Sequence, residues 1–314
     1  MLWFIIGAAI LFALFLLVFI PFLMVFYVPT RKKLSPGEYD LPKGAPYEPY
    51  YKDMIRWTDE VRAMKYTDYS ISSRDGLTLR ARYYEYEKGA PVELLFHGYR
   101  GSGERDMCGA VSRCHALGRS AFIIDQRAHG TSDGHITTFG IRERYDCIDW
   151  VNFAVRTFGE DVKLMITGIS MGAATVMMAL GEPLPENVVC ALADCGYTSP
   201  RDIIRKVLSD LHLPRWFFYP IIRLGARLFG GFDLESYSPL MGVGSSSLPI
   251  IFIHGDADTF VPSYMSEELY KASASVCKDI YIAKGADHGV AFPCDTGTYF
   301  AHLSAFEERC GAFK

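Results

Sequence analysis

The chain has 314 residues, half of them apolar, which is enough to bury the core of one globular domain. Its formal net charge is −4 at pH 7, so its charge gives no general attraction to nucleic acid, and we expect no nucleic-acid partner. None of its eight cysteines forms a Cys-x-x-Cys pair, which argues against zinc, and a disulfide framework is unusual in so long a chain. We therefore expect most cysteines to be reduced and buried.

The N-terminal segment is the first predicted element. Residues 2–28 contain no charged side chain and are dominated by Leu, Ile, Phe and Val. As a helix they would extend about 40 Å, longer than the roughly 30 Å hydrocarbon core of a bilayer, so they can span it with tilt. A cleavable signal peptide needs a basic start and a small-x-small cleavage site, and the sequence has neither. Residues 1–30 are therefore predicted to be a single-pass membrane anchor.

The charges that flank this segment predict its orientation. Arg31, Lys32 and Lys33 follow it directly, and no Lys or Arg precedes it. The positive-inside rule then favours a C-terminal domain in the cytoplasm, and an outward-facing domain is the alternative.

Residues 31–65 form a connector rich in Pro and Tyr, with a short helix predicted at 54–64, and residues 66–314 form the main domain. The first two strands of that domain, at 66–73 and 77–86, alternate across Asp75-Gly76 as in a β-hairpin. Strand patterns then alternate with helix patterns. The strands are expected at 92–96, 121–125, 162–166 and 188–194, and the helices at 106–117, 142–158 and 173–180. This alternation predicts a mostly parallel sheet with helices on both faces.

The motif at residues 168–172, Gly-Ile-Ser-Met-Gly, lies where a predicted strand passes directly into a predicted helix. A turn of this kind holds Ser170 on a strained corner with its hydroxyl exposed, and glycines are needed because side chains there would collide with the strand and the helix. The motif alone occurs often by chance, so it needs an acid and a histidine downstream.

The downstream loops supply both groups. A strand at 250–253 enters a loop with two carboxylates, Asp256 and Asp258, and a strand at 279–283 is followed by His288. An imidazole can take the proton of a serine hydroxyl, and a carboxylate on its other nitrogen fixes its tautomer and stabilises its charged form. The sequence therefore predicts Ser170 and His288 as catalytic residues, with either Asp256 or Asp258 as the acid.

The loop after the strand at 92–96 is a candidate anion site. A tetrahedral intermediate carries negative charge on the former carbonyl oxygen, and two backbone N–H groups should point at it. One is expected from Met171, the residue after the nucleophile. The loop has neither the Gly-x-x-x-x-Gly-Lys nor the Gly-x-Gly-x-x-Gly pattern, so we expect no nucleotide, and no other cofactor or metal is indicated.

From about residue 66 to 306 the chain resembles α/β-hydrolases of the membrane-anchored esterase and serine-aminopeptidase-like group. Residues 254–262 are similar to the superfamily stretch His-Gly-x-x-Asp-x-x-Val-Pro, which aligns the acid with Asp258 and leaves Asp256 as a turn residue. Residues 125–132 are similar to the turn Asp-x-Arg-Gly-His-Gly-x-Ser, with Ala128 in place of glycine and His129 as a structural histidine. The resemblance also implies that Tyr99 supplies the second oxyanion N–H.

An insertion at about 198–247 interrupts the strand–helix rhythm with two predicted helices, at 201–213 and 216–229, separated by Pro214. Hydrolases with this fold often carry such a lid, and the resemblance implies that Trp216, Phe217 and Phe218 form an acyl pocket. An ordinary amphipathic cap is the alternative. The basic residues among its apolar ones also suit anionic lipid headgroups.

The expected protein is a membrane-tethered serine hydrolase that cleaves small-molecule or lipid esters through an acyl-enzyme. An aminopeptidase, amidase or thioesterase would use the same machinery, and a non-catalytic binding module is the alternative outside enzymes. Its oligomeric state does not follow from the sequence.

Overall fold

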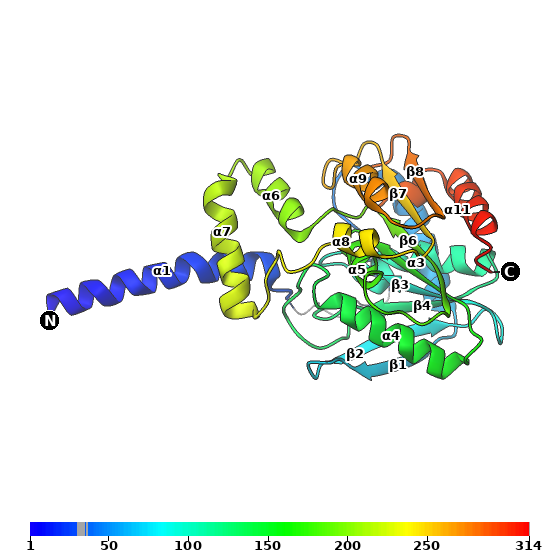
Figure 1. Cartoon of the computed structure of the whole chain (residues 1–314), viewed down its shortest axis with the longest axis horizontal. Coiled ribbons are helices and arrows are strands. Elements are labelled where there is room, and N and C mark those ends of the chain that lie inside the picture. Colours follow the sequence, from blue (N-terminus) through cyan, green and yellow to red (C-terminus); the bar gives the residue numbers. More distant parts are fainter. Residues whose placement is uncertain (30–34, 36, 314) are drawn as a thin grey trace.

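The computed structural model describes residues 1–29, 35 and 37–313; Arg31, Lys32 and Lys33, on which the expected orientation depends, lie outside the described residues. A central sheet flanked by helices forms most of the molecule, and one long helix projects from it (Figure 1).

The described residues contain one eight-stranded sheet, in the order β1-β2-β4-β3-β5-β6-β7-β8. Its strands are β1 (Thr67–Ser72), β2 (Thr78–Tyr84), β3 (Val92–Phe96), β4 (Ser120–Asp125), β5 (Leu164–Ile169), β6 (Val188–Asp194), β7 (Ile250–Gly255) and β8 (Lys278–Ala283). The β1–β2 and β2–β4 pairs are antiparallel, and the other five pairs are parallel. The predicted hairpin and the mostly parallel sheet are both confirmed. The inner strands β3–β6 are almost entirely buried, as expected of a sheet covered on both faces.

Helices cover both faces of this sheet. One face packs against α4 (Glu143–Phe158), α5 (Met171–Ala179), α8 (Pro239–Ser245) and α9 (Tyr264–Ala272). The other packs against α2 (Tyr51–Ala63), α3 (Gly103–Ala116), α10 (Ala291–Cys294) and α11 (Thr296–Cys310), and a 3-10 turn, η1 (Glu48–Tyr50), leads into α2. The connector therefore contributes a helix to the core, because Met54 and Trp57 of α2 are buried against the sheet layer.

The remaining helices lie together at one end of the molecule. They are α1 (Leu2–Phe26), α6 (Pro200–Asp210), α7 (Arg215–Gly225) and a π-helical turn, η2 (Ala226–Gly230). In Figure 1, α1 projects from the domain and α7 crosses it. The two expected lid helices are thus present, but the second ends at Gly225 and continues as η2. Phe22 and Phe26, at the C-terminal end of α1, are buried within the domain.

The cysteines differ in part from expectation. Cys277, before β8, and Cys310, at the end of α11, form a disulfide with a Cα–Cα distance of 5.9 Å. This pair is the exception to the expectation that most cysteines are reduced, because α11 packs beside β8 and brings together residues 33 positions apart. The other six are free, and all but Cys294 are buried.

Candidate active site

Ser170 lies at the turn between β5 and α5 and has the backbone angles φ 55° and ψ −115°. A positive φ is uncommon for any residue but glycine, so this turn is strained. The two flanking glycines make it possible. A Cβ on Gly172 would collide with the carbonyl group of Phe96, and a Cβ on Gly168 would collide with the backbone of Gly172. The sequence motif therefore forms the sharp strand-to-helix turn that it predicts.

Three loops at the carboxyl ends of β5, β7 and β8 bring the predicted residues together. His288 Nε2 lies 2.9 Å from Ser170 Oγ, and His288 Nδ1 lies 2.7 Å from Asp258 Oδ2. The ring of Phe260 contacts the imidazole edge to face, with ring centroids 5.1 Å apart. The carboxyl ends of parallel strands meet at one edge of a sheet, which is why residues 118 positions apart in sequence become neighbours.

Asp258 is held by four hydrogen-bonding groups. Its Oδ1 accepts the N–H groups of Phe260 and Val261 at 2.9 and 2.8 Å, and its Oδ2 also lies 3.1 Å from His254 Nε2. Burial opposes ionisation, but the hydrogen bonds of His254 and His288 outweigh it and lower the pKa of Asp258 to about 2. Asp258 is therefore a carboxylate at neutral pH. The sequence analysis did not single out His254, although it stands in the same motif.

Asp256 occupies a different position. Its Oδ1 accepts the N–H of Gly285 at 2.6 Å and so links the loops after β7 and β8. The structure places it on the exposed surface, whereas Asp258 is buried beside His288.

The two expected oxyanion donors lie close to the nucleophile in the chain fold: Tyr99 in the loop after β3, and Met171 directly after Ser170. The N–H groups on either side of Tyr99 are used: Gly98 donates to Asp106 Oδ2 at 2.9 Å and Arg100 donates to His129 Nε2 at 2.9 Å. Among the described residues, the N–H of Tyr99 has no acceptor. Met171 is the first residue of α5, where N–H groups have no partner within the helix.

The loop that carries Tyr99 is attached to the end of α1, a contact that the sequence analysis missed. The Tyr99 hydroxyl donates to the carbonyl oxygen of Val25 at 2.7 Å. The Arg100 guanidinium donates to the carbonyls of Met24 and Tyr27 at 2.9 and 2.8 Å. The last turn of α1 contains no basic residue, so its carbonyls need partners from elsewhere. The absence of a basic residue there is the sequence signal that could have indicated this contact.

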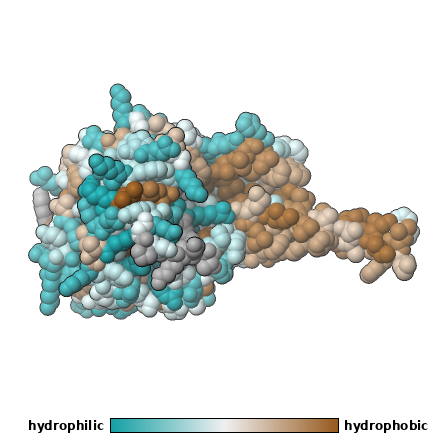
Figure 2. All heavy atoms as spheres, turned by 180° about the vertical axis from the view of Figure 1, so that it is seen from behind, coloured by the Kyte–Doolittle hydropathy of each residue, from teal (hydrophilic) through white to brown (hydrophobic). Residues whose placement is uncertain are grey.

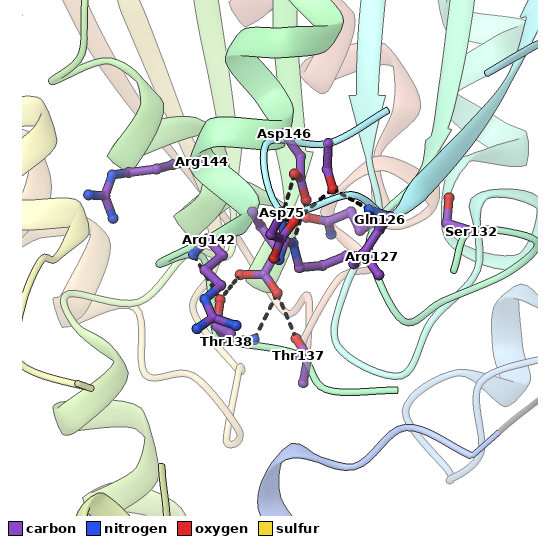
Figure 3. A network of polar contacts seen from close by, with 12 residues as sticks. Asp75, Gln126, Arg127, Ser132, Thr137, Thr138, Arg142, Arg144 and Asp146 are labelled. Carbon is purple, nitrogen blue, oxygen red and sulfur yellow. Dashed lines mark hydrogen bonds and ion pairs between the residues drawn. The ribbon is translucent and has the colours of Figure 1, made fainter. Parts of the chain in front are cut away.

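The turn at residues 125–132 is a buried polar scaffold beside this loop. Figure 3 shows Arg127 between Asp146 of α4 and Asp75 of the β1–β2 turn, and its nitrogens lie 2.6 and 2.8 Å from these carboxylates. Ala128 adopts a φ of 66°, the left-handed conformation for which the related turns use glycine. His129 is buried and bonded to the backbone of Arg100, which fits the expected structural role.

A cavity of about 360 Å³ opens beside Ser170 and His288. Its apolar wall comes from the connector, α2, the loop after β7 and α10: Tyr47, Met54, Trp57, Phe260 and Phe292. Sequence reasoning missed this wall, because the buried pattern of α2 indicates that it packs but not against what.

The structure does not bring the expected acyl-pocket residues Trp216, Phe217 and Phe218 to this cavity. Among the described residues, none of the three lines the cavity. Trp216 and Phe217 are 79% and 41% exposed, and Phe218 packs against the cluster that includes the end of α1. The physical reason is that α7 docks on α1 and not over Ser170.

One group of side chains in the described part of the chain has metal-ligand spacing: Cys195, Asp258 and His288 place donor atoms within 4.8 Å of one another. Both ring nitrogens of His288 are already engaged by Asp258 and Ser170. Burial raises the pKa of the Cys195 thiol well above its usual value, which opposes the thiolate that a metal needs. The geometry therefore suits a proton relay better than a metal.

Comparison with known proteins agrees with this geometry. Residues 92–241 match the family described as alpha/beta hydrolase fold. An esterase of Pyrococcus furiosus superposes with a TM-score of 0.65 at 22% identity, over 87% of this chain and 96% of the esterase. The chain has the α/β-hydrolase fold. An acylaminoacyl peptidase of Pyrococcus horikoshii shares the fold, with a TM-score of 0.58 at 19% identity over 82% of this chain and 43% of the peptidase.

Two curated proteins are similar to this chain in sequence. The uncharacterized protein YqkD of Bacillus subtilis is 28% identical over 191 residues, 60% of this chain and 62% of that protein. An uncharacterized membrane protein of Saccharomyces cerevisiae is 26% identical over 167 residues, 52% of this chain and 53% of that protein. The matched stretches thus span less than two thirds of either relative.

Proposed function

We propose that the protein is a serine hydrolase that cleaves carboxylic esters through an acyl-enzyme. The observation that carries this proposal is the continuous chain from Ser170 Oγ through His288 to Asp258, with distances of 2.9 and 2.7 Å. The fold and the esterase among its structural neighbours support the same reaction class.

In this mechanism His288 Nε2 takes the proton of Ser170 as the hydroxyl oxygen attacks the substrate carbonyl. Asp258 is ionised because its pKa is low. It accepts the hydrogen bond of the His288 Nδ1–H and stabilises the imidazolium. The backbone N–H groups of Tyr99 and Met171 bind the oxyanion, a contribution for which one donor is typically worth about 10²–10³-fold in kcat. His288 then gives its proton to the leaving alcohol, and a water attacks the acyl-enzyme by the reverse sequence.

The cavity wall favours an apolar acyl group. Trp57, Phe260 and Phe292 line the cavity that opens at Ser170, and burying an acyl chain against them gains free energy in proportion to the apolar area removed from water. We infer an ester with an apolar acyl chain as the substrate class, and a lipid ester is compatible with it.

A second candidate is an amide or aminoacyl substrate, and one observation favours it. Asp194 lines the cavity, and its Oδ1 is buried without a hydrogen-bond partner among the described residues. A carboxylate so placed could bind a protonated amine. An acylaminoacyl peptidase is among the structural neighbours.

Turnover separates the two candidates. The purified full chain should hydrolyse p-nitrophenyl esters, with kcat/KM rising from short to medium acyl chains, and should cleave aminoacyl p-nitroanilides much more slowly. Faster cleavage of the anilides, lost on Asp194→Asn, would favour the second candidate. Thioesters of matched acyl length test the thioesterase alternative in the same assay.

We also propose that α1 is a permanent membrane anchor. It is long and apolar enough to cross a bilayer by length and composition. Its end is also part of the folded domain: Phe26 is fully buried, its carbonyl accepts the N–H of Thr137, and the N–H of Val28 donates to His135. Cleavage after this segment would remove these contacts, which is not expected of a leader.

A further inference from the structure

We propose that α7 and η2 lie in the interfacial layer of the same bilayer that α1 spans, so that the hydrolase domain is held to the membrane at two places. We call residues Arg215–Gly230 the α7–η2 segment. The inference rests on the proposed anchor, and it is independent of the catalytic assignment.

The first argument is length. A helix needs about 20 residues to span a hydrocarbon core of roughly 30 Å. Phe22 and Phe26 are buried in the domain, so the part of α1 available to lipid ends close to Phe22. The span must therefore use nearly all of α1 from Leu2 onward, and the last turns before Phe22 lie at the membrane surface.

The α7–η2 segment packs against those last turns. The ring of Phe229 lies 5.6, 5.0 and 5.5 Å from the rings of Phe15, Phe19 and Phe22, measured between centroids. At Gly225 the two helices touch closely, since an added Cβ would lie 2.8 Å from the Cβ of Phe22. The α7–η2 segment therefore crosses α1 at the level where α1 leaves the bilayer.

The second argument is the surface of the lid helices. Six large apolar side chains are exposed on or next to the α7–η2 segment: Leu211, Trp216, Phe217, Leu224, Leu228 and Phe229. Figure 2 shows an apolar surface that continues from the projecting helix over the helices beside it, while most of the rest of this face of the domain is hydrophilic. Soluble surfaces rarely expose so large a continuous patch, and Trp is enriched at membrane interfaces.

Two of the three basic residues of the segment, Arg223 and Arg227, are paired with acidic residues of the domain. Arg223 pairs with Asp233 and Glu235, at 2.7 and 2.6 Å, and Arg227 pairs with Asp233 at 2.5 Å. Their pairing removes the main electrostatic reason for Arg223 and Arg227 to bind anionic headgroups. Apolar insertion, and not charge, is therefore the expected force, and binding should need no anionic lipid.

Continuity with α1 selects lipid as the occupant of this surface. Only 11% of the membrane-spanning stretch of α1 is buried, so the apolar patch runs directly into a helix that lipid surrounds. A second copy of the chain is the alternative occupant, and the experiment below separates the two.

Tryptophan fluorescence tests the proposal without using activity. The chain has four tryptophans; Trp57 and Trp150 are buried in the domain, and Trp3 lies on α1. A full-length Trp3→Phe protein is reconstituted in neutral phosphatidylcholine vesicles with acyl chains brominated near the headgroup. We expect quenching that disappears when Trp216→Phe is added and persists when Trp57→Phe is added instead. Quenching that Trp216→Phe leaves unchanged would overturn the proposal, as would an unquenched Trp216 in a protein that crosslinks as a dimer through this segment.

A second variant tests the consequence for substrate. Leu228→Glu places a charge on the patch and should lower turnover of a vesicle-embedded ester on the order of tenfold, with turnover of a water-soluble ester unchanged. Val276→Glu is the matched control, because Val276 is 98% exposed in the loop before β8, outside the lid helices. Equal effects of the two variants would contradict bilayer insertion. A wild-type protein that hydrolyses neither ester would contradict the proposed function instead, and the quenching result would stand.

Discussion

At the residue scale, the two aspartates of one loop have separate tasks. Asp258 is buried, ionised and 2.7 Å from His288, whereas Asp256 is exposed and bonded to the backbone of Gly285. We predict that Asp258→Asn lowers kcat for a p-nitrophenyl ester by about 10³–10⁴-fold, because the imidazole loses the partner that fixes its tautomer. Asp256→Asn should stay within a few-fold of wild type. Steady-state kinetics decide, and the reverse ranking would refute the assignment.

Asp194 makes a prediction about pH and stability. Burial raises the pKa of this carboxyl from 3.8 to about 6. Between these values the folded protein holds the proton and the unfolded chain does not, so wild-type stability falls as pH rises from about 4 to 6 and then levels off. Asp194→Asn has no carboxyl to titrate, so its stability does not fall in this way. As pH rises from about 4 to 6, its free energy of unfolding should therefore increase relative to that of wild type, by roughly 2–3 kcal/mol.

Thermal unfolding in detergent at pH 4 and pH 7.5 measures the difference. The gain from Asp194→Asn should be present at pH 7.5 and small at pH 4. The same difference at both pH values would contradict a raised pKa of Asp194.

The sequence could predict which residues form the candidate triad, but not which residues form the cavity around it. Ser170, Asp258 and His288 each follow a strand, and parallel strands bring their carboxyl ends together whatever the loop lengths. Resemblance, and not spacing, chose Asp258 over Asp256. Trp57 and Phe292 could not be foreseen as cavity walls. A buried pattern on α2 shows that the helix packs, but it does not identify a partner as distant in sequence as Phe292.

At the scale of elements, the end of α1 and the loop of Tyr99 form one unit. Arg100 holds the carbonyls of Met24 and Tyr27, and its own N–H is held by His129. The backbone N–H of the residue before it is the proposed oxyanion donor. The position of that donor should therefore depend on the contact with α1.

We predict that Arg100→Ala lowers kcat about tenfold, with little change in KM, because a displaced oxyanion donor weakens binding of the transition state more than of the substrate. Affinity for a trifluoromethyl ketone, which forms a tetrahedral adduct, should fall in parallel. Arg142→Ala is the matched control, since Arg142 also donates to a remote carbonyl, that of Gly231 at 2.8 Å. A kcat equal in the two variants would show that the contact is only structural.

The lid shows where reasoning by element failed. Its two helices were predicted close to their true bounds because each has a clear apolar face, and Pro214 separates them. The contact of α7 with α1 was not foreseen, because residues 2–28 were treated as a separate anchor. Once α1 is part of the domain surface, Phe229 has apolar partners in Phe15, Phe19 and Phe22.

At the scale of the whole molecule, anchor and orientation are a joint prediction. The buried end of α1 favours an uncleaved helix, and the basic residues at 31–33 favour a cytoplasmic domain. The disulfide between Cys277 and Cys310 points the other way, since such bonds are typical of oxidising compartments. We predict that the protein remains in carbonate-washed membranes at full mass, and that protease added to intact cells spares a C-terminal tag. A shortened mass would refute the anchor, and a cleaved tag would refute the cytoplasmic placement.

The central claim is that Ser170 is a nucleophile activated by His288. Fluorophosphonate labelling of the purified full chain, followed by peptide mass spectrometry and ester turnover, tests it most directly. We predict one adduct, on Ser170, and complete loss of turnover as it forms. Ser170→Ala should be unlabelled, should remain folded, and should lose about 10⁴-fold or more in activity. An unlabelled wild-type protein, or a Ser170→Ala variant within tenfold of wild-type turnover, would contradict the account.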